Sequence, residues 1–192
     1  MYRLVTLFFV SSLVLAAFYT QSGASDGMQQ VKPLESYGRV QGFRFTASSG
    51  EVLSYEELRG KVVVINFFFS RCGGICPTLN GNVKRAATTF ANLTDVQFVS
   101  ISVDPEYDTL ARLTHYRESF KAPKNWAFVR GTKEDVRSFL GTQLKLVSGD
   151  EPDMHSTRVV LLDQEGDIRG YYRGLEPESI QELIDGIKSL LS

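Results

Sequence analysis

The chain has 192 residues, of which 43% are hydrophobic and 22% are charged, and such a composition is typical of one compact globular domain. Its 21 basic and 22 acidic side chains leave a formal net charge of −1 at pH 7. Because so small a charge creates no field that would concentrate polyanions, we predict no binding of nucleic acid.

Residues 1–24 are predicted to be an export signal or a membrane anchor. Residues 4–18 form an almost unbroken apolar run, and Arg3 is the only charged residue before Asp26. The run is shorter than the roughly 20 apolar residues that span a bilayer, and small residues near position 24 offer a cleavage site, so a cleaved signal is favoured. We expect an exported protein in the bacterial periplasm, or one anchored to the membrane and facing it, rather than a mitochondrial one.

The rest of the chain is divided into a linker at residues 25–39 and one domain at residues 40–192. The linker is polar, contains glycine and lacks an apolar period. Both cysteines of the chain lie far downstream of the apolar run, and no cysteine stands directly after it to carry a lipid. We therefore do not expect a lipoprotein anchor. We expect the domain to be a monomer.

Predicted strands and helices alternate along the domain. Residues 62–69 (VVVINFFF) are β-branched and aromatic apart from one asparagine, as in a strand that is covered on both faces, and they are predicted to form the central strand. The other expected elements are a strand at 42–47, a helical turn at 53–58, a helix from Pro77 to about Leu93, a strand at 96–103, a helix at 109–120, a strand at 126–129, a helix at 133–140, strands at 158–162 and 168–172, and a helix at 177–191.

This alternation predicts an α/β fold, with a mixed β-sheet flanked by helices and an N-terminal hairpin extension. The turn at residues 163–166 connects the last two strands as a hairpin, so one edge of the sheet should be antiparallel.

Cys72 and Cys76 are the only cysteines, and they lie where the central strand ends and a helix begins. The positive end of the helix and the charge of Arg71 should help both thiols to ionise. Gly73 and Gly74 are expected to give the loop backbone angles that are closed to other residues. The spacing permits a disulfide or a shared metal, and a purely structural disulfide is disfavoured because so short a loop gains little stability.

The two histidines have different predicted settings. His115 lies within the helix expected at residues 109–120 and is interpreted as a solvated helix residue. His155 stands at the entrance to the strand at residues 158–162, which places an imidazole beside the two sulfurs if that strand neighbours the central one. Met154 is assigned to packing, since neighbours on a strand point to opposite faces.

Two thiolates and one imidazole form a soft donor set of low coordination number. Such a set suits trigonal Cu(I), or Cu(II) with one added ligand. Structural zinc takes four protein ligands, and the sequence offers no clear fourth. The residues therefore predict a copper site at Cys72, Cys76 and His155.

Four segments of the domain together resemble one known family. They are Gly60-Lys61-Val62, Cys72-x-x-x-Cys76-Pro77, Ser102-Val103-Asp104-Pro105-Glu106 followed by Asp108-Thr109, and His155-Ser156-Thr157 before a strand that ends in Asp163. Between about Gly38 and Ser192 the chain resembles the SCO/SenC copper-binding proteins used in assembling the copper centre of cytochrome c oxidase. The resemblance implies a thioredoxin-like fold, an export signal or anchor, and copper held at the positions of Cys72, Cys76 and His155.

The resemblance also implies a function. The protein would be a copper metallochaperone, which delivers one copper to a partner such as a cytochrome c oxidase subunit, or reduces the partner's copper site. It would then have no enzymatic activity beyond thiol-disulfide reduction by Cys72 and Cys76 as a redox pair. Asp104 matches an acidic position near the family's site and could support the ligands, although a turn residue before Pro105 is an equal interpretation.

The loop between the cysteines departs from the family pattern. Many members carry Pro-Asp after the first cysteine and Tyr-Thr before it, whereas this chain has Gly73-Gly74 and Ser70-Arg71. The three predicted ligands are unaffected, so the departure bears on the choice of partner.

The main alternative is an exported thiol-disulfide oxidoreductase that uses Cys72 and Cys76 without metal. Such enzymes usually space the pair by two residues and place a cis proline before the facing strand. Here the spacing is three, and no proline stands at the entrance through His155-Ser156-Thr157, which favours metal. A peroxidase with one attacking thiol and a binding module without chemistry are further alternatives with no positive signal.

Overall fold

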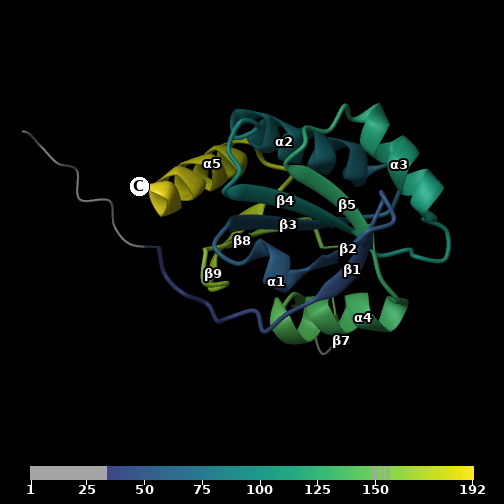
Figure 1. Cartoon of the computed structure of the whole chain (residues 1–192), viewed down its shortest axis with the longest axis horizontal. Coiled ribbons are helices and arrows are strands. Elements are labelled where there is room, and N and C mark those ends of the chain that lie inside the picture. The colour runs from purple at the N-terminus through teal and green to yellow at the C-terminus, as the bar shows by residue number, and fades with distance from the viewer. Residues whose placement is uncertain (1–33, 149–150, 153, 155) are drawn as a thin grey trace, which may run out of the picture. The chain divides into compact units, whose positions relative to one another are not determined.

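The computed structural model describes residues 34–148, 151, 152, 154 and 156–192 (Figure 1). The expected export segment and His155 lie outside these residues. No helix in the described part of the chain is long and apolar enough to cross a membrane.

The sheet that carries the domain has seven strands in the order β2-β1-β5-β4-β3-β8-β9. Strands β3, β4 and β5 pair in parallel, and all other neighbours pair antiparallel. The prediction of a mixed sheet with an antiparallel edge is therefore confirmed. The strands are β1 Arg44–Ala47, β2 Val52–Ser54, β3 Val62–Phe68, β4 Val96–Ser102, β5 Trp126–Arg130, β8 Arg158–Leu162 and β9 Ile168–Arg173.

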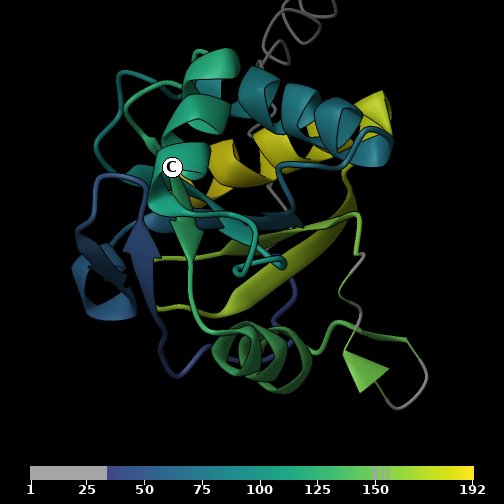
Figure 2. The ribbon, with the colours of Figure 1, turned by 90° about the vertical axis from the view of Figure 1, so that its right-hand side faces the viewer.

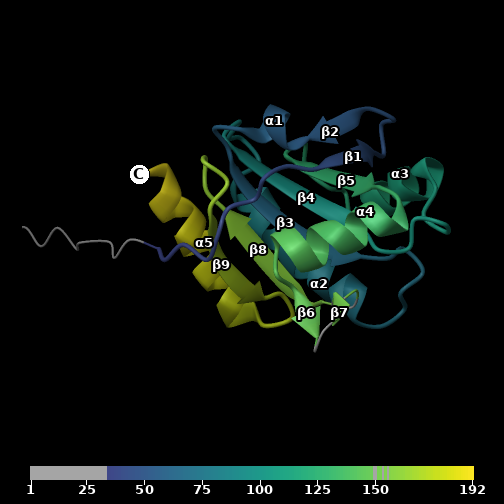
Figure 3. The same cartoon turned by 90° about the horizontal axis from the view of Figure 1, so that it is seen from below.

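Helices cover both faces of this sheet. Helices α2, α3 and α5 lie on one face, and α1 and α4 lie on the other (Figures 1 and 2). In the view from below, α4 lies in front of the strands (Figure 3). A pair of two-residue strands, which the sequence pattern did not predict, forms a separate small sheet. The two short strands are β6 Val147–Ser148 and β7 Glu151–Pro152. The helices are α1 Tyr55–Leu58, α2 Ile75–Thr89, α3 Leu110–Ser119, α4 Lys133–Ser138, a π-helical turn Phe139–Gln143 and α5 Pro177–Leu191.

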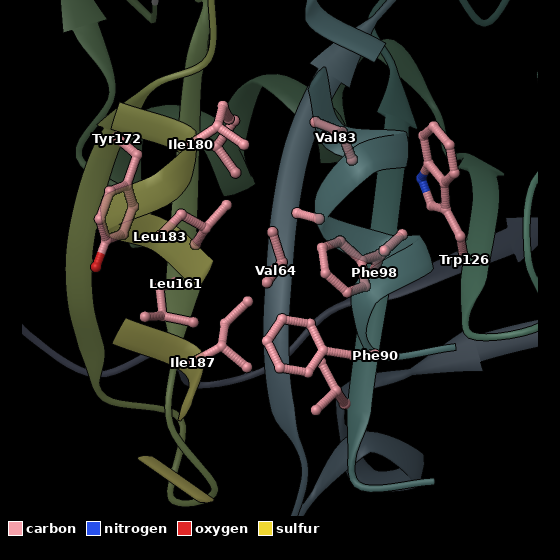
Figure 4. Packing of buried hydrophobic residues seen from close by; sticks show 14 of the residues in the cluster. Val64, Val83, Phe90, Phe98, Trp126, Leu161, Tyr172, Ile180, Leu183 and Ile187 are labelled. Carbon is pink, nitrogen blue, oxygen red and sulfur yellow. The ribbon is translucent and has the colours of Figure 1, made fainter. Parts of the chain in front are cut away.

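Strand β3 is an interior strand beside β4, which is the middle strand of the seven, and β3 is buried along its whole length, as its composition predicted. Because successive side chains point to opposite faces, Val62, Val64 and Phe68 pack under α2 and α5, while Val63, Ile65 and Phe67 pack on the other face. Figure 4 shows the first cluster around Val64. Each fully buried side chain of this size contributes about 1.5–3 kcal/mol relative to an exposed one, so this strand is a rigid base for the residues that follow it.

Three helices differ from their predicted bounds by more than one residue. The helical turn expected at residues 53–58 is shorter, because residues 53 and 54 belong to β2 and α1 begins at Tyr55. Helix α2 begins at Ile75 rather than at Pro77 and ends at Thr89. Pro77 is the third helical residue. A backbone N–H at this position would have no partner within the helix, so proline, which has no N–H, is tolerated there. Helix α4 ends at Ser138 and continues as the π-helical turn, which the apolar pattern did not distinguish from an α-helix.

Residues 34–39, which the sequence analysis assigned to the linker, pack against β9. The N–H of Tyr37 donates to the carbonyl of Ile168 at 2.8 Å, and the N–H of Ile168 donates to the carbonyl of Gly38 at 2.7 Å. Arg39 forms a two-pronged ion pair with Asp167 at 2.7 and 2.8 Å. The packed part of the described chain thus includes these residues.

Candidate metal centre

The two cysteines meet at the carboxyl end of β3, where the chain turns into α2. Cys72 lies in the connecting loop and is half-buried, whereas Cys76 lies in the first turn of α2 and is only 4% exposed. The N–H of Cys72 donates to the carbonyl of Phe69 at 3.1 Å, which turns the loop back toward the strand end. Both thiols are free, and they share a hydrogen bond.

The environment of Cys72 favours its thiolate. Burial acts to raise the pKa of this thiol, but hydrogen bonds from the Cys76 thiol and from the backbone N–H groups of Cys76, Gly74 and Ile75 outweigh it, so the pKa lies below its ordinary value. These N–H groups are among those at a helix N-terminus that lack partners within the helix. The expectation that the start of the helix favours the Cys72 thiolate is confirmed, whereas Arg71 is not among the main causes of the lowered pKa.

The environment of Cys76 has the opposite effect. Burial and the hydrogen bond with Cys72, together with the negative charges of Cys72 and Asp108, raise the pKa of Cys76 to about 11, although a hydrogen bond from the N–H of Phe69 opposes the shift. The expectation that both thiols ionise readily is therefore wrong for Cys76, because the sequence did not reveal its burial. The pair consists of one half-buried, ionisable sulfur and one buried thiol that donates to it.

Gly73 and Gly74 do not use the left-handed conformation that glycine favours. Neither has a positive φ, and φ of Gly74 is −104°. A Cβ built at either position would meet no heavy atom within 4 Å. Gly74 nevertheless combines φ −104° with ψ −103°, outside the α and β regions that other residues favour, so the expectation of unusual backbone angles holds for Gly74. The two exposed glycines also leave the surface beside Cys72 without side chains.

Asp104 lies next to the loop, beside the residue that precedes Cys72. Its carboxylate accepts from Nε of Arg71 at 2.6 Å, and its own N–H donates to Oγ of Ser102 at 3.1 Å. An exposed ion pair of this kind contributes about 0–1 kcal/mol, so its effect is mainly to orient the arginine. The described hydrogen bonds of Asp104 involve neither sulfur, and a supporting role toward the ligands stays a prediction.

Asp108 is a residue of the site to which the sequence analysis assigned no role. Its carboxylate is fully buried and accepts from the N–H of Ser70 at 3.1 and 3.3 Å and from the hydroxyls of Ser70 and Ser102. A buried carboxylate needs such donors, and this set anchors the loop two residues before Cys72. The only signal in the sequence was the position of Asp108 in a segment that resembles the family.

A chain of buried polar side chains ties α2 to the sheet behind the cysteines. Asn80 lies one helical turn after Cys76, so both residues are on the same face of α2. The hydrogen bonds run from Trp126 Nε1 to Ser100 Oγ at 2.8 Å, from Ser100 Oγ to Asn66 Oδ1 at 2.6 Å, from Asn66 Nδ2 to Asn80 Oδ1 at 2.9 Å and from Asn80 Nδ2 to Tyr116 Oη at 3.1 Å.

Tyr116 completes the wall of the site on the side of α3. Its ring stacks on Phe68, the last residue of β3, with a centroid distance of 4.9 Å. Burial first, and then the charges of Cys76, Cys72 and Asp108, raise the pKa of Tyr116 to about 12, against a hydrogen bond from Asn80. The phenol is therefore neutral in the physiological pH range.

The sequence profile of the SCO1/SenC family matches residues 32–192, which include the whole described sheet and both cysteines. The chain belongs to the SCO1/SenC family. The described domain is therefore a SCO1/SenC domain, and Cys72 and Cys76 lie within the residues that the family profile matches.

Two solved structures of SCO1/SenC proteins are similar to this chain. A SCO1/SenC family lipoprotein from Bacillus anthracis is 30% identical, with a TM-score of 0.73 over 84% of this chain and 99% of the other. BsSco, a member of the Sco family of cytochrome c oxidase assembly proteins with a disulfide switch, is 27% identical, with a TM-score of 0.71 over 84% of this chain and 98% of the other. These likenesses confirm the thioredoxin-like fold that the resemblance implied.

Two curated relatives support the same assignment. A SCO1 protein homolog from Bacillus subtilis is 28% identical over 170 residues, which cover 85% of this chain and 88% of the relative. A protein of Stutzerimonas stutzeri that carries the provisional name of copper-binding protein is 28% identical over 144 residues, which cover 70% of this chain and 69% of the relative.

In this SCO1/SenC chain the third predicted ligand, His155, lies outside the described residues. The strand that follows it, β8, pairs antiparallel with β3, with Val63 opposite Leu162 and Ile65 opposite Val160. The expected neighbourhood of these strands is confirmed, and the start of β8 lies toward the end of β3 that leads into the cysteine loop. Among the described residues, no group of three His, Cys, Asp or Glu side chains could hold a metal ion.

The remaining residues considered as ligands take no part in the described site. His115 is exposed on α3, in agreement with its interpretation as a solvated helix residue. Met154 packs against the hydrophobic cluster on the face of the sheet opposite α2, which agrees with its assignment to packing.

Proposed function

We propose that this SCO1/SenC protein is a copper metallochaperone that binds one copper ion through Cys72, Cys76 and His155. It delivers the copper to a partner in cytochrome c oxidase assembly, or reduces the cysteines of that partner's copper site. The observation that carries the proposal is the hydrogen-bonded pair of free thiols at the N-terminus of α2, which brings two sulfurs to one place.

The donor set fits copper as the cargo. Thiolate sulfurs and an imidazole nitrogen are soft ligands that suit Cu(I), and a low coordination number leaves the ion accessible to a partner. The half-exposed Cys72 provides that access, while Cys76 is sheltered by the core. The anchoring of the loop through Asp108 and of α2 through Asn80 holds both sulfurs in place without the metal.

Reduction of a partner's disulfide is the second candidate function, and the unequal thiols favour it. In this reaction the Cys72 thiolate attacks one sulfur of the partner's disulfide, and a mixed disulfide forms as the other partner sulfur leaves as a thiolate. The Cys76 thiol then passes its proton to the partner thiolate released in the first step, attacks Cys72 as a thiolate and releases the second partner sulfur as a thiolate. Two electrons pass to the partner, and Cys72 and Cys76 become a disulfide.

We also propose that the protein is exported by its N-terminal segment and acts outside the cytoplasm. The support is the apolar run at residues 4–18 and the similarity to a Bacillus anthracis lipoprotein. No cysteine lies close after the run to carry a lipid, so the proposal is a cleaved signal or a retained membrane anchor.

The test of the function is a titration of the reduced protein with Cu(I) and, separately, with Cu(II), followed by metal stoichiometry and optical spectra. We expect one tightly bound copper per chain and sulfur-to-Cu(II) charge-transfer bands. Oxidation of Cys72 and Cys76 to the disulfide should abolish Cu(I) binding, because the thiolates are the ligands. Absence of copper binding together with rapid dithiol exchange would leave the reductase function alone.

The role of His155 is tested by mutation, and His115, the other histidine of the chain, is the control. His155→Ala should weaken copper binding at least about tenfold, as expected when a ligand is lost, and should leave disulfide formation between Cys72 and Cys76 intact. His115→Ala should change neither property. Equal copper affinity in the two variants would remove His155 from the site.

A further inference from the structure

Two arginine side chains are held together on the surface next to Cys72. The guanidinium carbons of Arg71 and Arg112 lie 4.9 and 3.8 Å from the centroid of the Tyr107 ring. Nη1 of Arg112 also donates to the carbonyl of Tyr107 at 2.7 Å, and Nε of Arg71 donates to Asp104 at 2.6 Å. Both side chains are thus held in place before any partner arrives, which lowers the entropy that binding would otherwise cost.

These arginines keep unused capacity to bind anions. The Arg71 side chain is 59% exposed and has one carboxylate partner. Arg112 is exposed, and no carboxylate of the described residues lies within ion-pair distance of it. The exposed Glu106 lines a separate surface hollow with Arg130 and Lys133. Planar guanidinium groups bind carboxylates through paired hydrogen bonds, so an unpaired one favours an acidic ligand.

The two arginines are associated with the cysteine loop, because Tyr107 holds Arg112 near Arg71. Arg71 directly precedes Cys72, and on its other side Gly73 and Gly74 present bare backbone, with an exposed Ile75 beyond them. A partner sulfur that reaches Cys72 therefore brings the residues beside it onto this surface. An apolar residue of the partner can cover Ile75, while carboxylates can meet the two guanidinium groups.

We propose that Arg71, Tyr107 and Arg112 form a docking surface for an acidic segment of the partner, one that carries Asp or Glu beside the cysteine that reacts with Cys72. The inference rests on the proposed function, because it takes Cys72 and Cys76 to act on a partner's cysteines. It goes beyond the proposed function because it states that the recognised segment is negatively charged and that Arg71 and Arg112 select it. Tyr107 acts by holding the arginines and does not touch the reacting atoms.

The inference is tested by thiol-disulfide exchange with synthetic peptides. Each probe is an oxidised Cys-x-x-x-Cys peptide whose flanking residues are Asp, Asn or Lys, and the full-length reduced protein in detergent is the reductant. We expect the Asp peptide to be reduced about tenfold faster than the Lys peptide at low ionic strength, with a difference of about twofold or less in 0.5 M salt, because screening weakens the attraction between exposed charges.

Arg112→Glu is the variant that tests the surface, and Arg59→Glu is its matched control. Arg59 is also exposed and lies 5.9 Å from a tyrosine ring, but it precedes β3, at the end of the strand opposite the cysteine loop. The two variants change the net charge equally. We expect Arg112→Glu to abolish or reverse the preference for the Asp peptide and Arg59→Glu to retain most of it.

The fold should tolerate the Arg112 variants. Arg112 is the third residue of α3 after the N-cap Thr109, where glutamate completes a capping box and favours the helix dipole. Arg112→Gln, which removes the charge without reversing it, should give an intermediate preference. Urea unfolding of each variant checks that differences in rate do not arise from unfolding.

Two results would overturn the docking surface. One is equal reduction of the three peptides by the unaltered protein, and the other is an equal loss of preference in Arg59→Glu and Arg112→Glu. Copper titration of Arg112→Glu separates this inference from the proposed function, since one copper should bind with unchanged affinity. Absence of copper binding by the unaltered protein would contradict the metallochaperone role. The peptide preference would still test the docking surface, because peptide reduction does not require copper.

Discussion

At the scale of single residues, unequal burial and hydrogen bonding make Cys72 and Cys76 chemically different. Burial in the first turn of α2 and then the hydrogen bond with Cys72 favour the protonated thiol of Cys76, whereas that bond and the N–H groups at the start of α2 favour the thiolate of Cys72. The more exposed sulfur is therefore also the more nucleophilic one at neutral pH. This arrangement suits both an entry point for copper and an attacking thiol for exchange.

We predict that the two cysteines of the reduced, metal-free protein are alkylated with different pH profiles. The thiolate is the reactive form, so each rate rises as pH passes the pKa from below. The midpoint for Cys72 should lie below its ordinary value of 9.0, and that for Cys76 near 11. Iodoacetamide labelling with peptide mass spectrometry measures both. The urea-unfolded chain is the control, in which the midpoints should coincide, and coincident midpoints in the folded protein would contradict the assignment.

At the scale of elements, the site depends on how α2 and the loop before it are fixed to the sheet. Asp108 joins the start of α3 to the loop at Ser70, and Asn80 joins α2 to β3 and α3. Side chains that hydrogen-bond inside a core are costly to leave without partners, so these links hold each element in one position. The sulfurs are thereby placed by two elements that are themselves anchored.

We predict that Asn80→Ala destabilises the reduced protein by about 1–3 kcal/mol, because Nδ2 of the buried Asn66 loses its acceptor. Urea unfolding at neutral pH measures the change. Thr78→Ala is the control, since Thr78 is exposed on the same turn of α2, and its change should stay within about 0.5 kcal/mol. Equal stability of the two variants would show that the polar chain does not fix α2.

At the scale of the whole molecule, the sheet is completed at its β9 edge by residues 34–40. Val40 is buried, and its N–H donates to the carbonyl of Gly166 at 3.0 Å. Tyr37 meets Tyr171 of β9 with a ring-centroid distance of 5.6 Å. This segment therefore protects an edge strand that would otherwise expose unpaired backbone groups.

We predict that a chain beginning at Gln41 is less stable than one beginning at Leu34 by about 2 kcal/mol or more, because burial of Val40 alone contributes about 1.5–3 kcal/mol. Thermal unfolding of the two reduced chains measures the difference. Arg39→Ala in the longer chain measures the contribution of the exposed ion pair with Asp167. This variant should lower the free energy of unfolding by about 1 kcal/mol or less. Equal melting temperatures of the two chains would contradict the role of this segment.

Much of the fold could be predicted because its determinants are local. The apolar run of β3, the periods of α3 and α5 and the hairpin between β8 and β9 are visible in short windows of sequence, and the structure agrees with each. The π-helical turn after α4 and the first residue of α2 were not predicted, since they depend on packing rather than on pattern. Strands β6 and β7 have two residues each, which is too short to show an alternation of apolar and polar residues in the sequence.

The sequence by itself determined the family, the α/β order and the place of Cys72 and Cys76 at the switch from strand to helix. Only the tertiary structure decided which thiol is buried, that Asp108 anchors the loop and that Arg71 and Arg112 lie over Tyr107. The physical reason is that a strand or helix follows from neighbours along the chain, whereas burial, a pKa and a surface arise from residues that only folding brings together. Asp108 and Ser70, 38 positions apart, are an example.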